Sequence, residues 1–191
     1  TSRAGVKVNL MTGVGVGGDA EGDRLTSVEN VTGSAYSDTL IGNNANNLLI
    51  GAGGADTLDG GSGIDTASYG ASLIGVTVDL TSGQGFGGDD QGDRLYNMEN
   101  VTGSAYHDKL IGNSGTNLLS GGGGKDVLSG LAGDDQLDRA GGDASSRIRQ
   151  IPTTATPGDL NGSDGALRHR IAEIAAPDSS PQAADIGIWQ Q

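Results

Sequence analysis

Aliphatic residues recur every nine positions in two blocks of the chain. In the first block the recurring position holds Leu40, Leu49, Leu58 and Ala67, and in the second it holds Leu110, Leu119, Leu128 and Leu137. Each is the middle residue of a three-residue segment, and the six residues before each segment are rich in Gly, Asn and Asp. Because side chains alternate between the faces of a strand, the pattern predicts a turn and a short strand with one inward side chain. Four such nonads fill residues 33–68, and four fill residues 103–138.

A different pattern precedes each block. Val6, Val8 and Leu10 alternate with polar residues, and so do Val76, Val78 and Leu80. This alternation predicts a half-buried strand. We expect a Gly-rich loop to follow at residues 13–23 and 83–93, and then a second strand-like stretch at residues 25–32 and 95–102.

The two blocks belong to a duplication. Residues 5–65 align with residues 75–135 at an offset of 70, and Val31–Tyr36 recurs unchanged as Val101–Tyr106. We therefore divide the chain into a first unit, 1–70, and a second unit, 71–138. Each has a strand and loop half (1–32 and 71–102) and a half of four nonads (33–68 and 103–138). Since 70 residues is close to four coils of 18, we expect one continuous rod.

The rest of the chain, residues 139–191, lacks the repeat and holds all four prolines. We expect linker or disorder over residues 140–162, a short helix from about Asp164 to Ala176, and an irregular tail. No apolar run in the sequence is long enough to span a membrane.

Composition and charge narrow the choice of partner. The chain has 36 Gly, one Phe, one Trp and no Cys, with a formal net charge of −13. The absence of Cys excludes disulfides and Cys-ligated zinc, and the negative charge argues against nucleic acid. A chain so acidic and so poor in bulky apolar residues is expected to fold only when its carboxylates are neutralised. A hard cation is the natural partner.

The sixth position of every nonad supplies the candidate ligands. Two nonads make one coil, so loops two nonads apart are stacked, and Ca²⁺ accepts six to eight carboxylate and carbonyl oxygens. A single Gly-Asp turn would be only a turn, but eight in register favour metal binding. The sixth positions hold Asp38, Asn47, Asp56, Asp65, Asp108, Asn117, Asp126 and Asp135. We pair Asp38 with Asp56, Asn47 with Asp65, and their second-unit counterparts likewise. Sites with Asn are expected to be weaker.

Further candidates lie in the turns and in the Gly-rich loops. Glycines let the backbone turn its carbonyl oxygens toward an ion. The turn glycines are Gly51, Gly53, Gly60, Gly61, Gly63, Gly121, Gly123 and Gly130. Asp23 and Asp93 stand at position six of a degenerate nonad in the loops and are added as candidate ligands.

The segments Gly51–Asp59 and Gly60–Ser68 resemble the nonapeptide G-G-x-G-x-D-x-U-x of RTX (hemolysin-type) calcium-binding proteins. The resemblance implies an all-β fold, a right-handed parallel β-roll. It also implies several bound calcium ions, export by a type I apparatus of a Gram-negative bacterium, and folding in external Ca²⁺. Tyr36 and Tyr106 depart from the Gly of the pattern, as Ala67 departs from Leu.

Two functions fit these features. The first is a secreted, monomeric calcium-binding module that supports the export and folding of a larger exoprotein. The alternative is a non-catalytic fragment of a secreted enzyme (a protease, a lipase or a polysaccharide-modifying enzyme) or of a surface adhesin. The chain contains neither H-E-x-x-H nor G-x-S-x-G, so we expect no catalysis from these residues.

Overall fold

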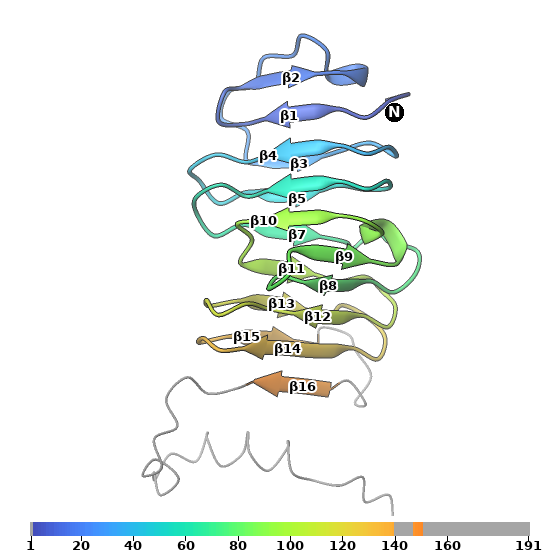
Figure 1. Cartoon of the computed structure of the whole chain (residues 1–191), viewed down its shortest axis with the longest axis vertical. Coiled ribbons are helices and arrows are strands. Elements are labelled where there is room, and N and C mark those ends of the chain that lie inside the picture. The colour runs from blue at the N-terminus through green and yellow to red at the C-terminus, as the bar shows by residue number, and fades with distance from the viewer. Residues whose placement is uncertain (1, 140–146, 151–191) are drawn as a thin grey trace, which may run out of the picture. The chain divides into compact units, whose positions relative to one another are not determined.

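Short strands joined by turns account for nearly all of the described structure (Figure 1). The computed structural model describes residues 2–139 and the backbone of residues 147–150. The first unit contains β1 (Lys7–Asn9), β2 (Val14–Val16), β3 (Asn30–Thr32), β4 (Thr39–Ile41), β5 (Leu48–Ile50), β6 (Thr57–Asp59) and β7 (Thr66–Ser68). The second contains β8 (Thr77–Asp79), β9 (Gln84–Phe86), β10 (Arg94–Tyr96), β11 (Asn100–Thr102), β12 (Lys109–Ile111), β13 (Leu118–Ser120), β14 (Val127–Leu131) and β15 (Gln136–Asp138). The 3-10 segments η1 (Gly18–Ala20) and η2 (Gly88–Asp90) and the strand β16 (Arg147–Gln150) complete the set.

The strands form two facing sheets. The larger has the order β16-β14-β12-β8-β9-β10-β6-β4-β1-β2, and the smaller has the order β15-β13-β11-β7-β5-β3. Successive nonad strands alternate between the sheets, so parallel neighbours are 18 residues apart, as in Leu40↔Leu58 and Leu49↔Ala67. This register confirms the 18-residue coil expected from the spacing, and it confirms the all-β fold and parallel β-roll that the resemblance implies.

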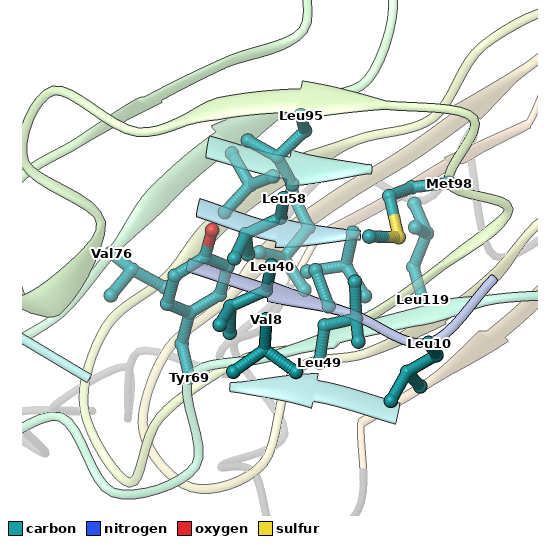
Figure 2. Close-up of a cluster of buried hydrophobic side chains, with 14 of the residues drawn as sticks. Val8, Leu10, Leu40, Leu49, Leu58, Tyr69, Val76, Leu95, Met98 and Leu119 are labelled. Carbon is teal, nitrogen blue, oxygen red and sulfur yellow. The ribbon is translucent and has the colours of Figure 1, made fainter. Parts of the chain in front are cut away.

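The eighth position of the nonad forms the core. Leu40, Leu49, Leu58 and Ala67 are fully buried, as are the three leucines at positions 110, 119 and 128. Figure 2 shows the leucines of successive coils stacked with Val8 and Leu95 between the sheets. Within the described residues, the interior is one layer of aliphatic side chains, which one Tyr and one Met join. A core this thin explains how the chain folds with so few aromatic residues.

The two units form one continuous solenoid. The last strands of the first unit pair in parallel with strands of the second, β6 with β10 and β7 with β11. The prediction of a single rod is therefore confirmed for the repeats.

The halves that precede the nonads differ from the prediction in two respects. The Gly-rich segment is not a loop throughout, because β9 pairs antiparallel with β8 and with β10. The stretch 95–102 is not one strand: a turn at Asn97, with φ of 50°, sends β10 into one sheet and β11 into the other. Each half thus adds an antiparallel hairpin to one sheet instead of a regular coil.

The expected linker at residues 140–162 and the expected helix near residues 164–176 lie outside the described residues. Within the described part of the chain, no helix has the length and apolar character needed to cross a membrane.

The core assignment gives a direct test on two leucines. Leu58 is fully buried, whereas Leu73 is 79% exposed. Leu58→Ala should lower the free energy of unfolding by about 2–5 kcal/mol, because it opens a cavity in a single-layer core. The control Leu73→Ala should change it by less than about 0.5 kcal/mol. Urea unfolding in Ca²⁺, followed by circular dichroism, measures both, and equal effects would contradict the core assignment.

Candidate metal centre

The sixth-position side chains form two ladders along the solenoid. Asp56 accepts the backbone N–H of Asp38 through Oδ1 at 2.8 Å, and Asp65 accepts that of Asn47 at 2.7 Å. The second unit repeats both contacts at 3.0 Å, from Asp108 to Asp126 and from Asn117 to Asp135. All of these side chains are buried. The expected pairs therefore lie on top of each other.

The first residue of each nonad is Gly because the sixth side chain folds back over it. A Cβ on Gly51 or Gly60 would overlap the carboxylate of Asp56 or Asp65. Gly121 and Gly130 stand in the same relation to Asp126 and Asp135. These four glycines thus provide space for a buried carboxylate.

The other candidate glycines shape the turn. Gly61 and Gly63 have φ of 89° and 132°, in the left-handed region that favours glycine. Gly53 and Gly123 do not have positive φ, and they lie over Ala35 and Ala105 of the neighbouring coil.

In the first two nonads of a unit, the chain itself satisfies the sixth-position side chain. Asp38 accepts the N–H of Val6 at 2.7 Å, and both the N–H and the hydroxyl of Ser34. Asn47 accepts the N–H of Asn43 at 2.8 Å and donates through Nδ2 to the Glu29 carbonyl at 3.2 Å. Asp108 and Asn117 repeat these arrangements. The amide donor of Asn gives a physical reason for the weaker sites expected at positions 47 and 117.

In the first unit, the third and fourth nonads leave carboxylate oxygens without a hydrogen-bond partner among the described residues. Oδ2 of Asp56 and Oδ2 of Asp65 are buried and accept no hydrogen bond from the described residues. Burial raises the pKa of Asp56 to about 7 and also raises the pKa of Asp65. An ionised carboxylate buried without a partner is unfavourable, so each site calls for a proton or a cation.

In the second unit, burial likewise raises the pKa of three carboxyl groups, those of Asp108, Asp126 and Asp135.

The surrounding oxygens suit a calcium ion. Oδ2 of Asp38 and the carbonyl oxygen of Gly51, from adjacent coils, both lie within 2.6 Å of the position that a Cβ on Gly33 would take, so the two oxygens are close together. No three His, Asp or Glu side chains of the described residues converge as a ready metal cluster. An ion here would therefore combine stacked carboxylates with backbone carbonyls, an all-oxygen set of the kind Ca²⁺ prefers.

The two candidate ligands in the Gly-rich loops, Asp23 and Asp93, differ in burial. Asp93 is buried and continues the ladder, because it accepts the N–H of Asp56 at 2.8 Å and the hydroxyl of Tyr69 at 3.0 Å. Burial raises its pKa to about 6. Asp23, its counterpart in the first unit, is exposed.

Two acidic residues of this region were not predicted as candidate ligands from the sequence. Asp90 is fully buried, and its Oδ1 has no hydrogen-bond partner among the described residues. Burial raises its pKa to about 7. Glu99 accepts the N–H of Asp65 at 2.9 Å and so takes the role of a sixth-position Asp. A comparison of the two units could have pointed to Asp90, because the first unit has Ala20 at the equivalent position. The spacing of the nonads gives no indication of Glu99.

Stacked Gly-rich turns with buried carboxylates, on both edges of a parallel β-roll, define a cation-binding solenoid. The family model of the RTX calcium-binding nonapeptide repeat, in 4 copies, matches residues 32–67 and 101–143. The chain therefore contains RTX repeats, and these repeats bind Ca²⁺. No match to a curated protein was found. Asp90, Asp93 and Glu99 lie between the two matched ranges.

The space beside the first glycine can be tested with two alanine variants. Gly51→Ala should lower the free energy of unfolding by about 1–3 kcal/mol, because its Cβ overlaps the Asp56 carboxylate. Gly53→Ala is the matched control, since its Cβ would lie at an ordinary 3.8 Å from Ala35. Urea unfolding in Ca²⁺ gives both values. If Gly53→Ala proved as costly as Gly51→Ala, glycine would be needed for flexibility and not for space.

The role of the unpartnered Oδ2 of Asp56 can be tested by removing the charge of its carboxylate. Asp56→Asn should raise the Ca²⁺ concentration at the folding midpoint by about tenfold, because ligand charge sets affinity in such sites. Asp138→Asn removes the same charge from an exposed position and should leave the midpoint nearly unchanged. Calcium titrations followed by circular dichroism compare the two. Equal shifts would assign the effect to net charge and not to the site.

Proposed function

We propose that this chain is a non-catalytic, monomeric folding module of a larger exoprotein, and that external Ca²⁺ drives its folding. The observation that carries the proposal is the pair of buried, unpartnered oxygens on Asp56 and Asp65 within matched RTX repeats. They mark positions where the folded chain is incomplete without a positive charge.

The mechanism is a linkage between binding and folding. Without a cation, the compact chain must bury carboxylates within a molecule whose formal net charge is −13. Ca²⁺ neutralises these carboxylates and binds the folded state preferentially, so its binding free energy becomes folding free energy.

The residues contribute unequally in this proposal. Asp56 and Asp65 supply the charged oxygens of the first unit, and Asp126 and Asp135 take these places in the second. Asp38 and Asp108 would complete the ligand set from the adjacent coil, where their Oδ2 atoms lie close to the carbonyl oxygens of Gly51 and Gly121. Asn47 and Asn117 contribute mainly to the stacking of the coils.

Calcium availability then places the folding step outside the cell. RTX repeat proteins are typically secreted by Gram-negative bacteria, and extracellular modules bind Ca²⁺ with dissociation constants of about 10⁻⁴–10⁻³ M. Cytosolic Ca²⁺ is too scarce to fill such sites. The chain would remain unfolded and able to pass through a type I secretion apparatus, and it would fold on reaching the exterior.

A calcium titration of the whole chain tests this function. Far-UV circular dichroism should show a cooperative transition from coil to β-structure between excess chelator and about 10 mM Ca²⁺, a range that brackets extracellular affinities. Mg²⁺ should fail as a substitute because it demands a smaller, octahedral ligand set.

Two results would count against the proposal. Full β-structure in excess chelator would mean that the solenoid folds without a cation. A midpoint near 10⁻⁷ M, in the range of intracellular sensors, would remove the link to the extracellular space.

A further inference from the structure

The same sequence meets two different environments in the two units. Gly22–Leu25 recurs as Gly92–Leu95. In the second unit the coil at residues 51–68 covers it, so that Asp93 is 1% and Leu95 is 4% exposed. In the first unit Asp23 is exposed and Leu25 only partly buried. The surface that is buried in the second unit is therefore exposed in the first unit.

Backbone hydrogen bonds hold the covered version in place. Arg94 donates to the carbonyl of Asp56 at 2.8 Å, and Gly60 donates to that of Tyr96 at 3.0 Å. Arg24, the counterpart of Arg94, forms only an isolated bridge to Val14. The strands β2 and β3 are the last of their sheets at this end. Both sheets thus end in an edge that could accept another coil.

Tyr69 fills the interior of the joint between the units. It is 2% exposed, its hydroxyl donates to Asp93 at 3.0 Å, and its N–H donates to the carbonyl of Thr102 at 2.8 Å. Figure 2 shows its ring among the buried aliphatic side chains, and Val76 belongs to the same cluster.

The first unit has a hollow where the second has this ring. The hollow has a volume of about 500 Å³, and its lining includes Asp23, Thr32 and Val6, the counterparts of Asp93, Thr102 and Val76. Its rim is built as in the second unit. The hydroxyl oxygen of Ser2 accepts the N–H of Asp19 at 3.0 Å, as that of Ser72 accepts the N–H of Asp89 at 3.2 Å.

We propose that this end of the solenoid is a docking face for the terminal coil of another repeat unit, supplied from upstream in the same polypeptide, with a tyrosine in the hollow. At the existing joint, Ser72 donates its N–H to the carbonyl of Tyr69 at 2.9 Å, so three residues of chain lead from the ring to the rim. A tyrosine three residues before Ser2 would reach the hollow by the same path.

The far end of the chain argues against a second copy as the occupant. The terminal coil that another copy would offer contains β14, the counterpart of β6. In this chain β14 already pairs with β16 on the edge that β6 uses to bind β10. A further unit, ending in a free coil, meets no such obstacle.

The test extends the full chain at its N-terminus with a second copy of residues 1–70. Because the protein has no cysteine, Leu25→Cys in the original unit gives a single thiol. In Ca²⁺, the extension should slow its modification by a thiol reagent about tenfold or more, since only local opening would then expose it. The rate should approach that of Leu95→Cys in the unextended chain.

Two variants of the added copy identify the occupant of the hollow. Tyr69→Ala in that copy should restore much of the reactivity, whereas Tyr36→Ala, at a residue 48% exposed, should not. Circular dichroism confirms that each chain is folded. Equal thiol reactivity with and without the extension would overturn the proposal. Protection in the unextended chain that grows with protein concentration would also overturn it, in favour of a second copy.

Discussion

The structure depends on one repeated contact, in which a buried carboxylate accepts the backbone N–H of a residue 18 positions earlier. This contact fixes the distance between coils, and it places negative charge inside a thin solenoid. It also explains the glycine at the first position of the nonad, because the carboxylate occupies the space of a Cβ. Coil spacing, glycine content and the demand for a cation thus have a common origin.

The difference between Asp and Asn along the ladder shows where that demand falls. At position 47 the amide donates to the Glu29 carbonyl, so both ends of the side chain are satisfied. Asp56 and Asp65 have no donor in the corresponding place, and one oxygen of each remains buried without a partner. In the proposed function, carboxylates in these two nonads weaken the metal-free fold and form the cation sites, so that the same atoms set stability and binding.

The sequence was most informative where the nine-residue period is regular. The spacing of Leu40, Leu49 and Leu58 predicted the strands, the 18-residue coil and the stacking of Asp38 on Asp56, because each depends on local periodicity. It failed between the blocks, where the outcome depends on contacts far apart in the chain. Glu99 could not be found from spacing, since its partner Asp65 is 34 residues away and belongs to the other unit. The hairpin formed by β9 was hidden by glycines that suggested a loop.

The comparison of Arg24 with Arg94 shows that local sequence alone does not determine whether a segment forms a strand in this chain. Both follow Gly-Asp and precede Leu, yet only Arg94 lies in a strand, because only there does another coil supply hydrogen-bond partners. A solenoid of this kind gains its stability from neighbouring coils, so a terminal coil is the least supported. Tyr69 strengthens one such contact, because its hydroxyl donates to Asp93 and its backbone N–H donates to the carbonyl of Thr102 across the joint. The hollow at the uncovered end is lined by the counterparts of the residues around Tyr69. In our proposal it is therefore the receiving half of an equivalent joint.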